Sequence, residues 1–474
     1  MKKAPITFEG MVQSVSFPNK GIVIPVDREP SDMPVPPTGF SLPEKPSRPV
    51  RVDNVLPGQR VEVFQSPHMQ KRREGSLRRV ICPAPYEISS PCPHASFCGG
   101  CNYQTVPYEI QLHWKQAAVS SLLDAVPDLG DYSFLPIIPS PLPEAYRNKM
   151  EYSFGDEYKD GPLTLGLHKR GAHLDIVPTV GCKIVHEDFN RIVRGTADYF
   201  RAAGASYHNT RSHEGWLRHL VLRRSYMDGS VLVNLVTSSQ GELDAASFTA
   251  MLQSLPLEGR ITGILHTIND SLADIVQADR MHVLYGEPDL TENLLGLSFR
   301  LSPFSFFQTN SKGAEALYRL VREMAGDLRE QNVFDLYCGT GTISQIMADA
   351  GAGQVIGIEI VEEAVEAARM NAAANGLQNC SFLAGDVLKL VDTLPIRPDL
   401  IILDPPRDGI HPKALPKILA YRPERFLYIA CKPTSLARDL PAFREAGYKL
   451  RTVRCVDMFP GTVHVETVAL MTRN

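Results

Sequence analysis

The stretch NVFDLYCGTGTISQIMADAGAGQVIGIEIVEEAVEAARMNAAANG, residues 332–376, decides the fold of the C-terminal third of the chain. Its apolar segments VFDL and QVIGIEI predict buried strands, and each is followed by a segment with helical apolar spacing. Similar apolar segments recur in LIILDPPR, RFLYIACKP and HVETVALMT. Strands that alternate with helices predict an α/β domain with a doubly wound, Rossmann-like sheet, whose binding residues follow the carboxyl ends of the strands.

Length and composition set the broad class of the protein. A chain of 474 residues is too long for one ordinary core, so we expect two or three domains. Hydrophobic residues make up 43% and charged residues 22%, which is typical of a globular protein. The sequence has no apolar run of about 18 residues that would predict a membrane-spanning helix, and MKKAPITFEG does not resemble a secretory signal. We therefore expect a cytoplasmic protein, and the sequence indicates no obligate protein partner.

Charge is unevenly distributed along the chain. The net charge of −4 argues against a general nucleic-acid binder. Two local groups of basic residues nevertheless stand out. They are Lys71, Arg72, Arg73, Arg78 and Arg79 in one segment, and Arg218, Arg223 and Arg224 in another. Each group is consistent either with an ordinary solvated surface or with a patch that binds RNA.

The rest of the chain divides into two further regions. Alternating apolar residues over 5–28 and 50–86 predict a small all-β domain over residues 1–88, with the proline-rich stretch 29–50 as a loop insertion. Residues 89–297 contain a helical segment over 108–126 and many short alternating segments, which predict a central α+β domain with antiparallel strands. The α/β domain then covers residues 298–474.

The glycine turn in residues 335–342 predicts a cofactor site. Gly339 and Gly341 let the backbone approach a ligand closely. Glu359 ends the next predicted strand, where a carboxylate can accept both hydroxyl groups of a ribose, and Asp386 ends a further strand, where it suits an adenine amino group. The pattern D-x-x-C-G-x-G differs from the G-x-G-x-x-G of dinucleotide-binding proteins. It favours S-adenosylmethionine, and hence a methyltransferase.

Three residues at predicted strand ends indicate the reaction. Asp404 and Cys431 each follow an apolar strand, and Glu466 begins the last one. A thiolate that adds to carbon 6 of uracil makes carbon 5 nucleophilic toward a methyl donor, and a base must then remove the proton from carbon 5. Cys431 and Glu466 suit these two roles. Cys338 is the competing nucleophile, although its place in the glycine turn is better explained by packing beneath the cofactor.

A group of cysteines precedes the central domain. Cys92, Cys98 and Cys101 lie in PCPHASFCGGC, and Cys182 follows later in the chain. Four thiolates suffice for a zinc ion or for an iron–sulfur cluster, and their spacing does not decide between the two.

The segments FSFFQTN, DLYCGTGT, IGIEI, DPPRDGIHP, ACKPTSLARDL and HVETVALM together resemble the RNA uracil-5 methyltransferase family. The resemblance implies that Cys431 is the nucleophile and Glu466 the base. It also implies a set of residues that contact S-adenosylmethionine, to which we add Asp386: Gln308, Tyr337, Glu359 and Asp404. The chain departs from the family's usual Ser-Cys-Asn-Pro, because it has Ala430, Cys431, Lys432 and Pro433.

The N-terminal half resembles the branch of this family that acts on ribosomal RNA. That resemblance implies a [4Fe–4S] cluster held by Cys92, Cys98, Cys101 and Cys182, and a TRAM domain, a small RNA-binding barrel, at the N-terminus. The family's tRNA enzymes generally lack both features, so we expect 23S ribosomal RNA as the substrate. The alternatives are a tRNA uracil-5 methyltransferase and, in another class, a non-catalytic RNA-binding protein that keeps the fold.

Overall fold

The computed structural model describes residues 4–16, 19–26, 48–272, 279–391, 394 and 396–473. It separates into two compact units, Met1–Ser90 with Asn102–Trp114, and Pro91–Cys101 with Lys115–Asn474. The domain boundaries expected after residues 88 and 297 stay predictions. Among the helices of the described ranges, none is both long and apolar enough to cross a membrane.

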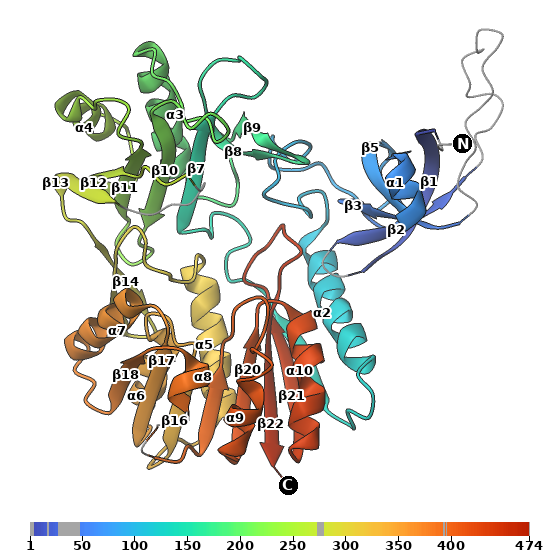
Figure 1. Cartoon of the computed structure of the whole chain (residues 1–474), viewed down its shortest axis with the longest axis vertical. Coiled ribbons are helices and arrows are strands. Elements are labelled where there is room, and N and C mark those ends of the chain that lie inside the picture. The colour runs from blue at the N-terminus through green and yellow to red at the C-terminus, as the bar shows by residue number, and fades with distance from the viewer. Residues whose placement is uncertain are drawn as a thin grey trace. The chain divides into compact units, whose positions relative to one another are not determined.

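The first unit contains the small β-barrel that the sequence predicts (Figure 1). Five strands close it in the order β1-β2-β3-β5-β4: β1 (Ile6–Ser16), β2 (Lys20–Pro25), β3 (Val50–Asp53), β4 (Arg60–Gln65) and β5 (Glu74–Cys82). Inward-facing valines such as Val23, Val52 and Val63 are fully or almost fully buried and form its core. The proline-rich stretch 29–50 lies outside the described residues up to residue 47.

The first basic segment lies on this barrel. Lys71 and Arg72 end the short helix α1 (Pro67–Arg72), and Arg78 and Arg79 belong to β5. The Arg78 guanidinium lies 4.6 Å from the centre of the Phe64 ring. These basic side chains are exposed, so the segment is available to a polyanion.

The second unit contains the α+β region that the sequence predicts. Its seven-stranded sheet has the order β13-β12-β11-β10-β7-β8-β9, and all neighbours are antiparallel except β11 and β12. The strands are β7 (Lys149–Gly155), β8 (Thr164–Lys169), β9 (Ala172–Pro178), β10 (Leu217–Arg224), β11 (Ser230–Thr237), β12 (Arg260–Ile268) and β13 (Arg280–Gly286). Helices α3 (Glu187–Ala202) and α4 (Ala245–Gln253) share its core.

The second basic group, by contrast, is no surface patch. Arg218 and Arg223 of β10 are 3% and 1% exposed. Arg218 donates to the carbonyl oxygens of Asn269 and Ser271, and Arg223 donates to that of Ser305 at 2.6 Å. Buried guanidinium groups require such acceptors. Two of the three arginines therefore serve the interior of the protein, which the sequence could not show.

The doubly wound sheet has eight strands in the order β18-β17-β16-β19-β20-β22-β21-β6. They are β6 (Ser133–Ile138), β16 (Asn332–Leu336), β17 (Gln354–Glu359), β18 (Cys380–Ala384), β19 (Leu400–Leu403), β20 (Arg425–Ala430), β21 (Tyr448–Val456) and β22 (Glu466–Arg473). The Rossmann-like fold is confirmed, and β22 alone runs against its neighbours. Strand β6 was not expected in this sheet, because it comes from the region assigned to the central domain. It pairs in parallel with β21.

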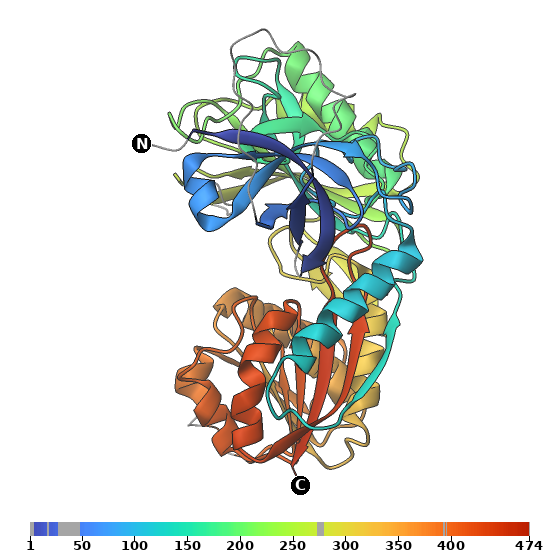
Figure 2. The same cartoon turned by 90° about the vertical axis from the view of Figure 1, so that its right-hand side faces the viewer.

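Helices cover both faces of this sheet, as the alternating side chains of β20 demonstrate. Leu427 and Ile429 share a core with Leu317 of α5 (Ser311–Ala325). Phe426 and Tyr428 point the other way and contact Phe443 of α10 (Pro433–Glu445). Figure 2 shows α5 and α10 on opposite sides of the strands. The remaining helices of this domain are α6 (Thr342–Asp349), α7 (Glu362–Ala374), α8 (Val387–Leu390) and α9 (Leu415–Ala420).

The helix expected over residues 108–126 is present as α2 (Tyr108–Asp124). A hairpin of β14 (Leu290–Leu294) and β15 (Leu297–Leu301) completes the fold. Within the second unit, Lys115 of α2 forms an ion pair with Asp457 directly after β21, with 2.7 Å between Nζ and Oδ1. Lys115 also donates to the carbonyl oxygen of Phe459. Both charged side chains are buried away from water, so each charge is stabilised mainly by the opposite charge of its partner.

We expect Lys115→Met to lower the free energy of unfolding by about 3–5 kcal/mol, because it leaves the Asp457 carboxylate buried without its partner. Urea unfolding measures the change. Arg201→Ala is the matched control, because it removes a cation from the exposed Arg201–Asp198 pair of α3. That control should change stability by about 0.5 kcal/mol or less, and equal effects of the two substitutions would contradict the structural role of the buried pair.

Candidate active site

The turn after β16 holds the expected cofactor residues. Tyr337 has a positive φ of 69°, which is unusual for a residue other than glycine. Its N–H and that of Cys338 both donate to the carbonyl oxygen of Ile358, at 2.9 and 3.0 Å. The next glycines, Gly339 and Gly341, have φ values of 53° and 72°. The turn is thus a strained, hydrogen-bonded loop of the kind that lies at binding sites.

Glu359 lies beside this turn at the end of β17. Its carboxylate accepts a hydrogen bond from the N–H of Gly339 at 3.0 Å, and others from the N–H groups of Ile360 and Val361. These bonds orient the half-buried carboxylate. Ile360 next to it is 67% exposed, which leaves an apolar surface beside a carboxylate at the carboxyl edge of the sheet.

Asp386 and Cys338 both have structural roles. Asp386 caps α8, because its carboxylate accepts the N–H of Leu388 at 2.9 Å. Cys338 packs in a buried cluster with Val365 and Phe382. The Cys338 pKa lies well above its usual value, mainly because of burial. A buried thiol of this kind is a poor nucleophile, which agrees with the packing role expected for Cys338.

Gln308 lies in the loop between β15 and α5. Its side chain is hydrogen-bonded to the buried Tyr318 of α5. The side chain of Asn148 donates to the backbone oxygen of Gln308 at 3.0 Å, and its backbone N–H donates to that of Thr309 at 2.7 Å. Phe306 in the same loop is 69% exposed, and its carbonyl oxygen accepts a bond from Thr340 of the glycine turn. The loop is therefore tied both to the turn and to the central sheet.

The reversed direction of β22 brings Cys431 and Glu466 together. Ala430 of β20 is paired with Thr467 of β22. Cys431 follows Ala430, and Glu466 precedes Thr467, so the antiparallel register sets the two residues across from each other. A strand parallel to β20 would instead have carried Glu466 to the opposite edge of the sheet.

Three carboxyl groups with raised pKa values, Glu466 among them, lie in this part of the sheet. Burial raises the Glu466 pKa to about 7, and Arg407 opposes that rise. Burial, with Glu466 and Asp335 as neighbours, holds the Asp404 pKa well above its usual value. Burial also raises the Asp335 pKa to about 6, despite a hydrogen bond from Ser344. Raised carboxyl pKa values in a cluster are typical of groups that exchange protons near neutral pH.

The Cys431 thiol responds to the same charges. Burial and, to a lesser extent, the negative charges of Glu466 and Asp404 together raise its pKa to about 11, and Arg407 opposes that rise. Arg407 is therefore the cation that favours the thiolate. Lys432, the cation directly beside Cys431 in the sequence, is exposed at the N-cap of α10, and the charge that lowers the Cys431 pKa comes from the DPPR segment instead.

The cysteine group, defined as Cys92, Cys98, Cys101 and Cys182, draws its members from two segments that lie in the same region. Burial and, to a lesser extent, the negative charges of the other three thiols together raise the Cys182 pKa to about 12. Arg170 lies beside them and donates to the carbonyl oxygens of Ala95 and Cys101. In the part of the chain that the structure describes, however, no three or more His, Cys, Asp or Glu side chains are grouped so that they could hold a metal ion.

Sequence reasoning gave no role to three residues that act on this site. Arg407 lies within the quoted DPPR segment and could have been recognised there. His464 lies in HVET, and burial lowers its pKa to about 4, so it is neutral at physiological pH. Tyr318 lies in an ordinary amphipathic helix, and its sequence carries no signal that it contacts Gln308.

Comparison with known proteins identifies relatives along the whole chain. Residues 328–429 match the family described as a methyltransferase domain. An uncharacterized RNA methyltransferase of Clostridium tetani is 46% identical over 90% of this chain and 92% of its own length. One of Caldanaerobacter subterraneus is 44% identical over 96% of this chain and its own full length.

Among solved structures, the chain is similar to the tRNA (uracil-54, C5)-methyltransferase of Pyrococcus abyssi in complex with S-adenosyl-L-homocysteine. The TM-score is 0.73 at 23% sequence identity, and the match covers 98% of this chain and 100% of that one. At this level of identity the similarity shows that the fold is shared over all parts of the chain.

We expect Arg407→Ala to slow the alkylation of Cys431 at pH 8 about tenfold, because the loss of a nearby cation raises the thiol pKa and reduces the thiolate fraction. Peptide mass spectrometry after timed treatment with iodoacetamide resolves Cys431 from the other eight cysteines. Lys432→Asn, which removes a cation directly beside Cys431 in the sequence, is the control and should leave the rate unchanged. The reverse pattern would assign the thiolate-stabilising charge to Lys432.

Proposed function

The chain belongs to the RNA methyltransferase family, and we propose that it methylates carbon 5 of a uridine with S-adenosylmethionine as the methyl donor. The observation that carries this proposal is the Cys431–Glu466 pair, a thiol directly after β20 and a raised-pKa carboxyl group at the start of the antiparallel neighbour β22. A nucleophile for carbon 6 and a base for carbon 5 are the two groups that this reaction requires.

The residues at the carboxyl edge fit S-adenosylmethionine. We assign the ribose hydroxyls to Glu359 and the adenine amino group to Asp386, with the exposed Ile360 beside the adenine ring. Gln308, Tyr337 and Asp404 would complete the contacts on the methionine side. The donor supplies the methyl group and a positive sulfonium charge, which favours the thiolate beside it.

The residues of the chain perform the remaining steps. The Cys431 thiolate adds to carbon 6 of uracil, and the electrons of the carbon 5–carbon 6 double bond move onto the carbon 4 carbonyl to give an enolate. Carbon 5 then takes the methyl group. Glu466 removes the proton from carbon 5, the double bond re-forms, and Cys431 leaves as the thiolate. A uracil in structured RNA must first be unstacked to reach Cys431.

Two classes of RNA are candidates for the substrate. We propose 23S ribosomal RNA, which is supported by the likeness of the N-terminal half to the ribosomal branch. Transfer RNA is the second candidate, and a specific observation favours it. The tRNA-modifying structure from Pyrococcus abyssi matches 98% of this chain, so a tRNA enzyme can share the complete architecture.

The N-terminal half supports two further proposals. We propose that the barrel is a TRAM domain and that its basic segment contacts RNA phosphates, because Lys71, Arg72 and Arg78 are exposed on one strand and its preceding helix. The enzyme would act in the cytoplasm, where these RNAs are found.

We also propose that the cysteine group holds a [4Fe–4S] cluster. Four thiols that influence one another's pKa near Arg170 agree in number and kind with the ligands of such a cluster, and binding it would require them to move closer together. The transfer of a methyl group moves no electrons, so the cluster would stabilise the fold or shape the RNA-binding surface.

Glu466→Gln should accumulate a covalent protein–RNA complex, because the amide cannot remove the proton from carbon 5 and Cys431 cannot leave. Denaturing gel electrophoresis detects the complex, and Cys431→Ala should abolish it.

In the parent enzyme the base acts in its deprotonated form. With a Glu466 pKa near 7, the rate at which the covalent complex releases Cys431 should rise about tenfold from pH 6 to pH 8. Full turnover by Glu466→Gln would contradict the assignment of Glu466 as the base.

Mass mapping of RNA from cells with and without the gene tests the substrate. We expect one or two uridines of 23S ribosomal RNA to lose 5-methylation without the gene. The parent gene should restore the modification, and Cys431→Ala should not. Loss of the mark from tRNA alone would leave the chemistry intact and select the second candidate, whereas unchanged uridines in both RNAs would contradict the proposed reaction.

Protein purified without oxygen should contain about four iron and four sulfide ions per chain. Cys98→Ser should lose most of both, together with the broad visible absorption of the cluster. Cys82→Ser is the control, because Cys82 is an exposed thiol on the barrel. Stoichiometric zinc without sulfide, or a protein that contains neither iron nor zinc, would contradict the proposed [4Fe–4S] cluster.

A further inference from the structure

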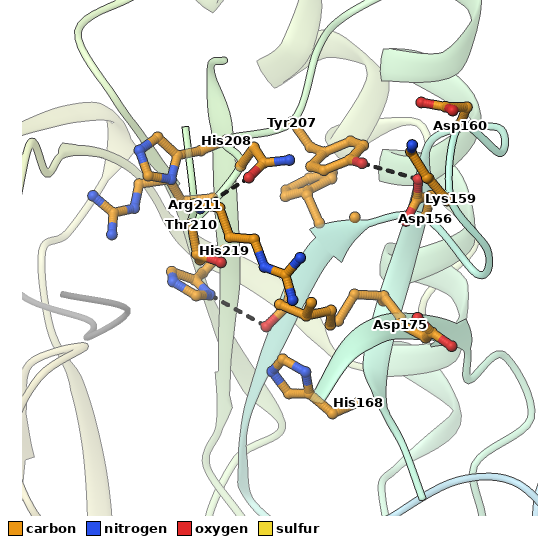
Figure 3. A pocket seen from close by; sticks show the side chains of 17 residues that line it. Asp156, Lys159, Asp160, His168, Asp175, Tyr207, His208, Thr210, Arg211 and His219 are labelled. Carbon is orange, nitrogen blue, oxygen red and sulfur yellow. Dashed lines mark hydrogen bonds between the residues drawn. The ribbon is translucent and has the colours of Figure 1, made fainter. Parts of the chain in front are cut away.

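A pocket of 320 Å³ opens in the central sheet, at the level of β7 to β10 (Figure 3). Its lining, here called the central pocket, includes side chains of β7, β8, β9 and β10 and of the loop over residues 207–211. None of these residues belongs to the predicted cofactor site, the Cys431–Glu466 pair or the cysteine group. A volume of this order holds one small ligand.

The pocket is preformed by the backbone. A bulge in β10 between Leu217 and His219 places Arg218 as an extra residue, so that Arg218 and the following His219 both line the pocket. Bulges commonly re-aim side chains in this way beside functional sites. The backbone at residue 215 passes so close to that of Tyr207 that only glycine fits there, because a Cβ atom would lie 1.9 Å from the Tyr207 carbonyl oxygen.

Hydrogen bonds order the loop and the wall opposite it. The Asn209 side chain accepts the N–H groups of Arg211 and Ser212 at 2.9 and 3.2 Å. The Tyr207 hydroxyl donates to Asp156 at 2.9 Å, which is drawn as a dashed line in Figure 3. Such order lowers the entropic cost of binding a ligand.

The lining combines three kinds of group. Aromatic and imidazole rings come from Tyr207, His168 and His219, and an apolar surface comes from Leu174, which is 51% exposed. Arg211 adds an exposed cation, and Figure 3 shows its side chain reaching between those of Tyr207 and His168. Lys159 and the buried Arg218 add further positive charge, and three aspartates offer acceptors: Asp156, Asp160 and Asp175.

We propose that the central pocket binds one unstacked nucleotide of the RNA substrate, distinct from the uridine that is methylated. Rings and apolar side chains stack on a base, polar groups on the wall read its edge, and a cation at the rim meets its phosphate. The proposal rests on the RNA substrate that the family shares and does not depend on which atom is methylated.

Two of the strands that line the pocket, β7 and β10, also reach the loop of Gln308. His219 and Ser153 face each other near the pocket, and Arg223 and Lys149 face each other four residues away. Four residues of strand span about 13 Å. At that far end Arg223 donates to Ser305, and Asn148 donates to Gln308 and Thr309. A nucleotide in the pocket is thereby held at a fixed distance from the active-site loop, close enough for a few nucleotides to bridge.

Two exposed residues at the rim give the test, because their substitution leaves the core intact. We expect Arg211→Ala and His168→Ala each to raise the Kd and KM for purified substrate RNA roughly five- to tenfold, with kcat at saturating RNA unchanged. The first should also reduce the slope of log Kd against log salt concentration by about 1, as expected for one lost phosphate contact. Ultraviolet cross-linking should join a nucleotide to the peptide that contains residues 207–211.

Arg194→Ala is the matched control, because Arg194 is an exposed cation on α3 of the same domain, outside the pocket lining. If both rim variants match this control in Kd, KM and cross-linking, the pocket does not bind RNA and the proposal is wrong. Binding is measured on RNA purified from cells that lack the gene, separately from methylation. If the parent enzyme binds this RNA normally but does not methylate uracil, the proposed reaction is wrong and the proposal for the central pocket still stands.

Discussion

The direction of β22 is the constraint on which the active site depends. In a fully parallel sheet, residues that follow strands share one edge and residues that precede them share the other. Because β22 alone is antiparallel, its first residue, Glu466, lies at the carboxyl edge beside Cys431. The backbone ladder between β20 and β22 sets this approach, so the spacing of the two groups does not rely on flexible loops. The buried Lys115–Asp457 pair stabilises the chain just after β21, the strand that pairs with β22 on its other side.

The price of this arrangement is a set of acids in one buried place. Burial raises the pKa of Asp335, Asp404 and Glu466, and the charges of Glu466 and Asp335 raise that of Asp404 further, so the protonated forms are favoured. Arg407 acts on both Cys431 and Glu466. One cation therefore favours ionisation of the nucleophile and of the base together. A ligand that brings positive charge to this edge would shift both groups in the same direction, which links binding to activation.

Much of the α/β domain could be predicted because its signals are local. The glycine turn, the acid at the end of β17 and the cysteine after β20 each follow an apolar strand within a few residues, and parallel strands bring such positions to one edge. The membership of β6 in this sheet and the burial of Arg218 and Arg223 could not be predicted in the same way. They depend on partners far away in the chain, namely β21, Asn269 and Ser305. The residues next to an arginine in the sequence do not reveal whether its side chain is buried or exposed. The roles of the cofactor and cysteine residues remain predictions, since they concern ligands.

Chemistry and RNA choice are separate problems for this fold. Cys431, Glu466 and the carboxylates around them meet only the uracil ring and the methyl donor, and these are the same in every RNA. They cannot distinguish ribosomal RNA from tRNA. The distinction must arise where the chain contacts nucleotides beyond the target, and the exposed basic segment of the barrel and the central pocket are two surfaces suited to that task. The barrel segment offers mainly charge, which follows a phosphate backbone with little regard to sequence. The central pocket offers ordered polar groups and rings on rigid strands, which can distinguish one base from another. Strands β7 and β10 carry this pocket at one end and support the Gln308 loop at the other, so recognition there acts on the same framework that positions the active site.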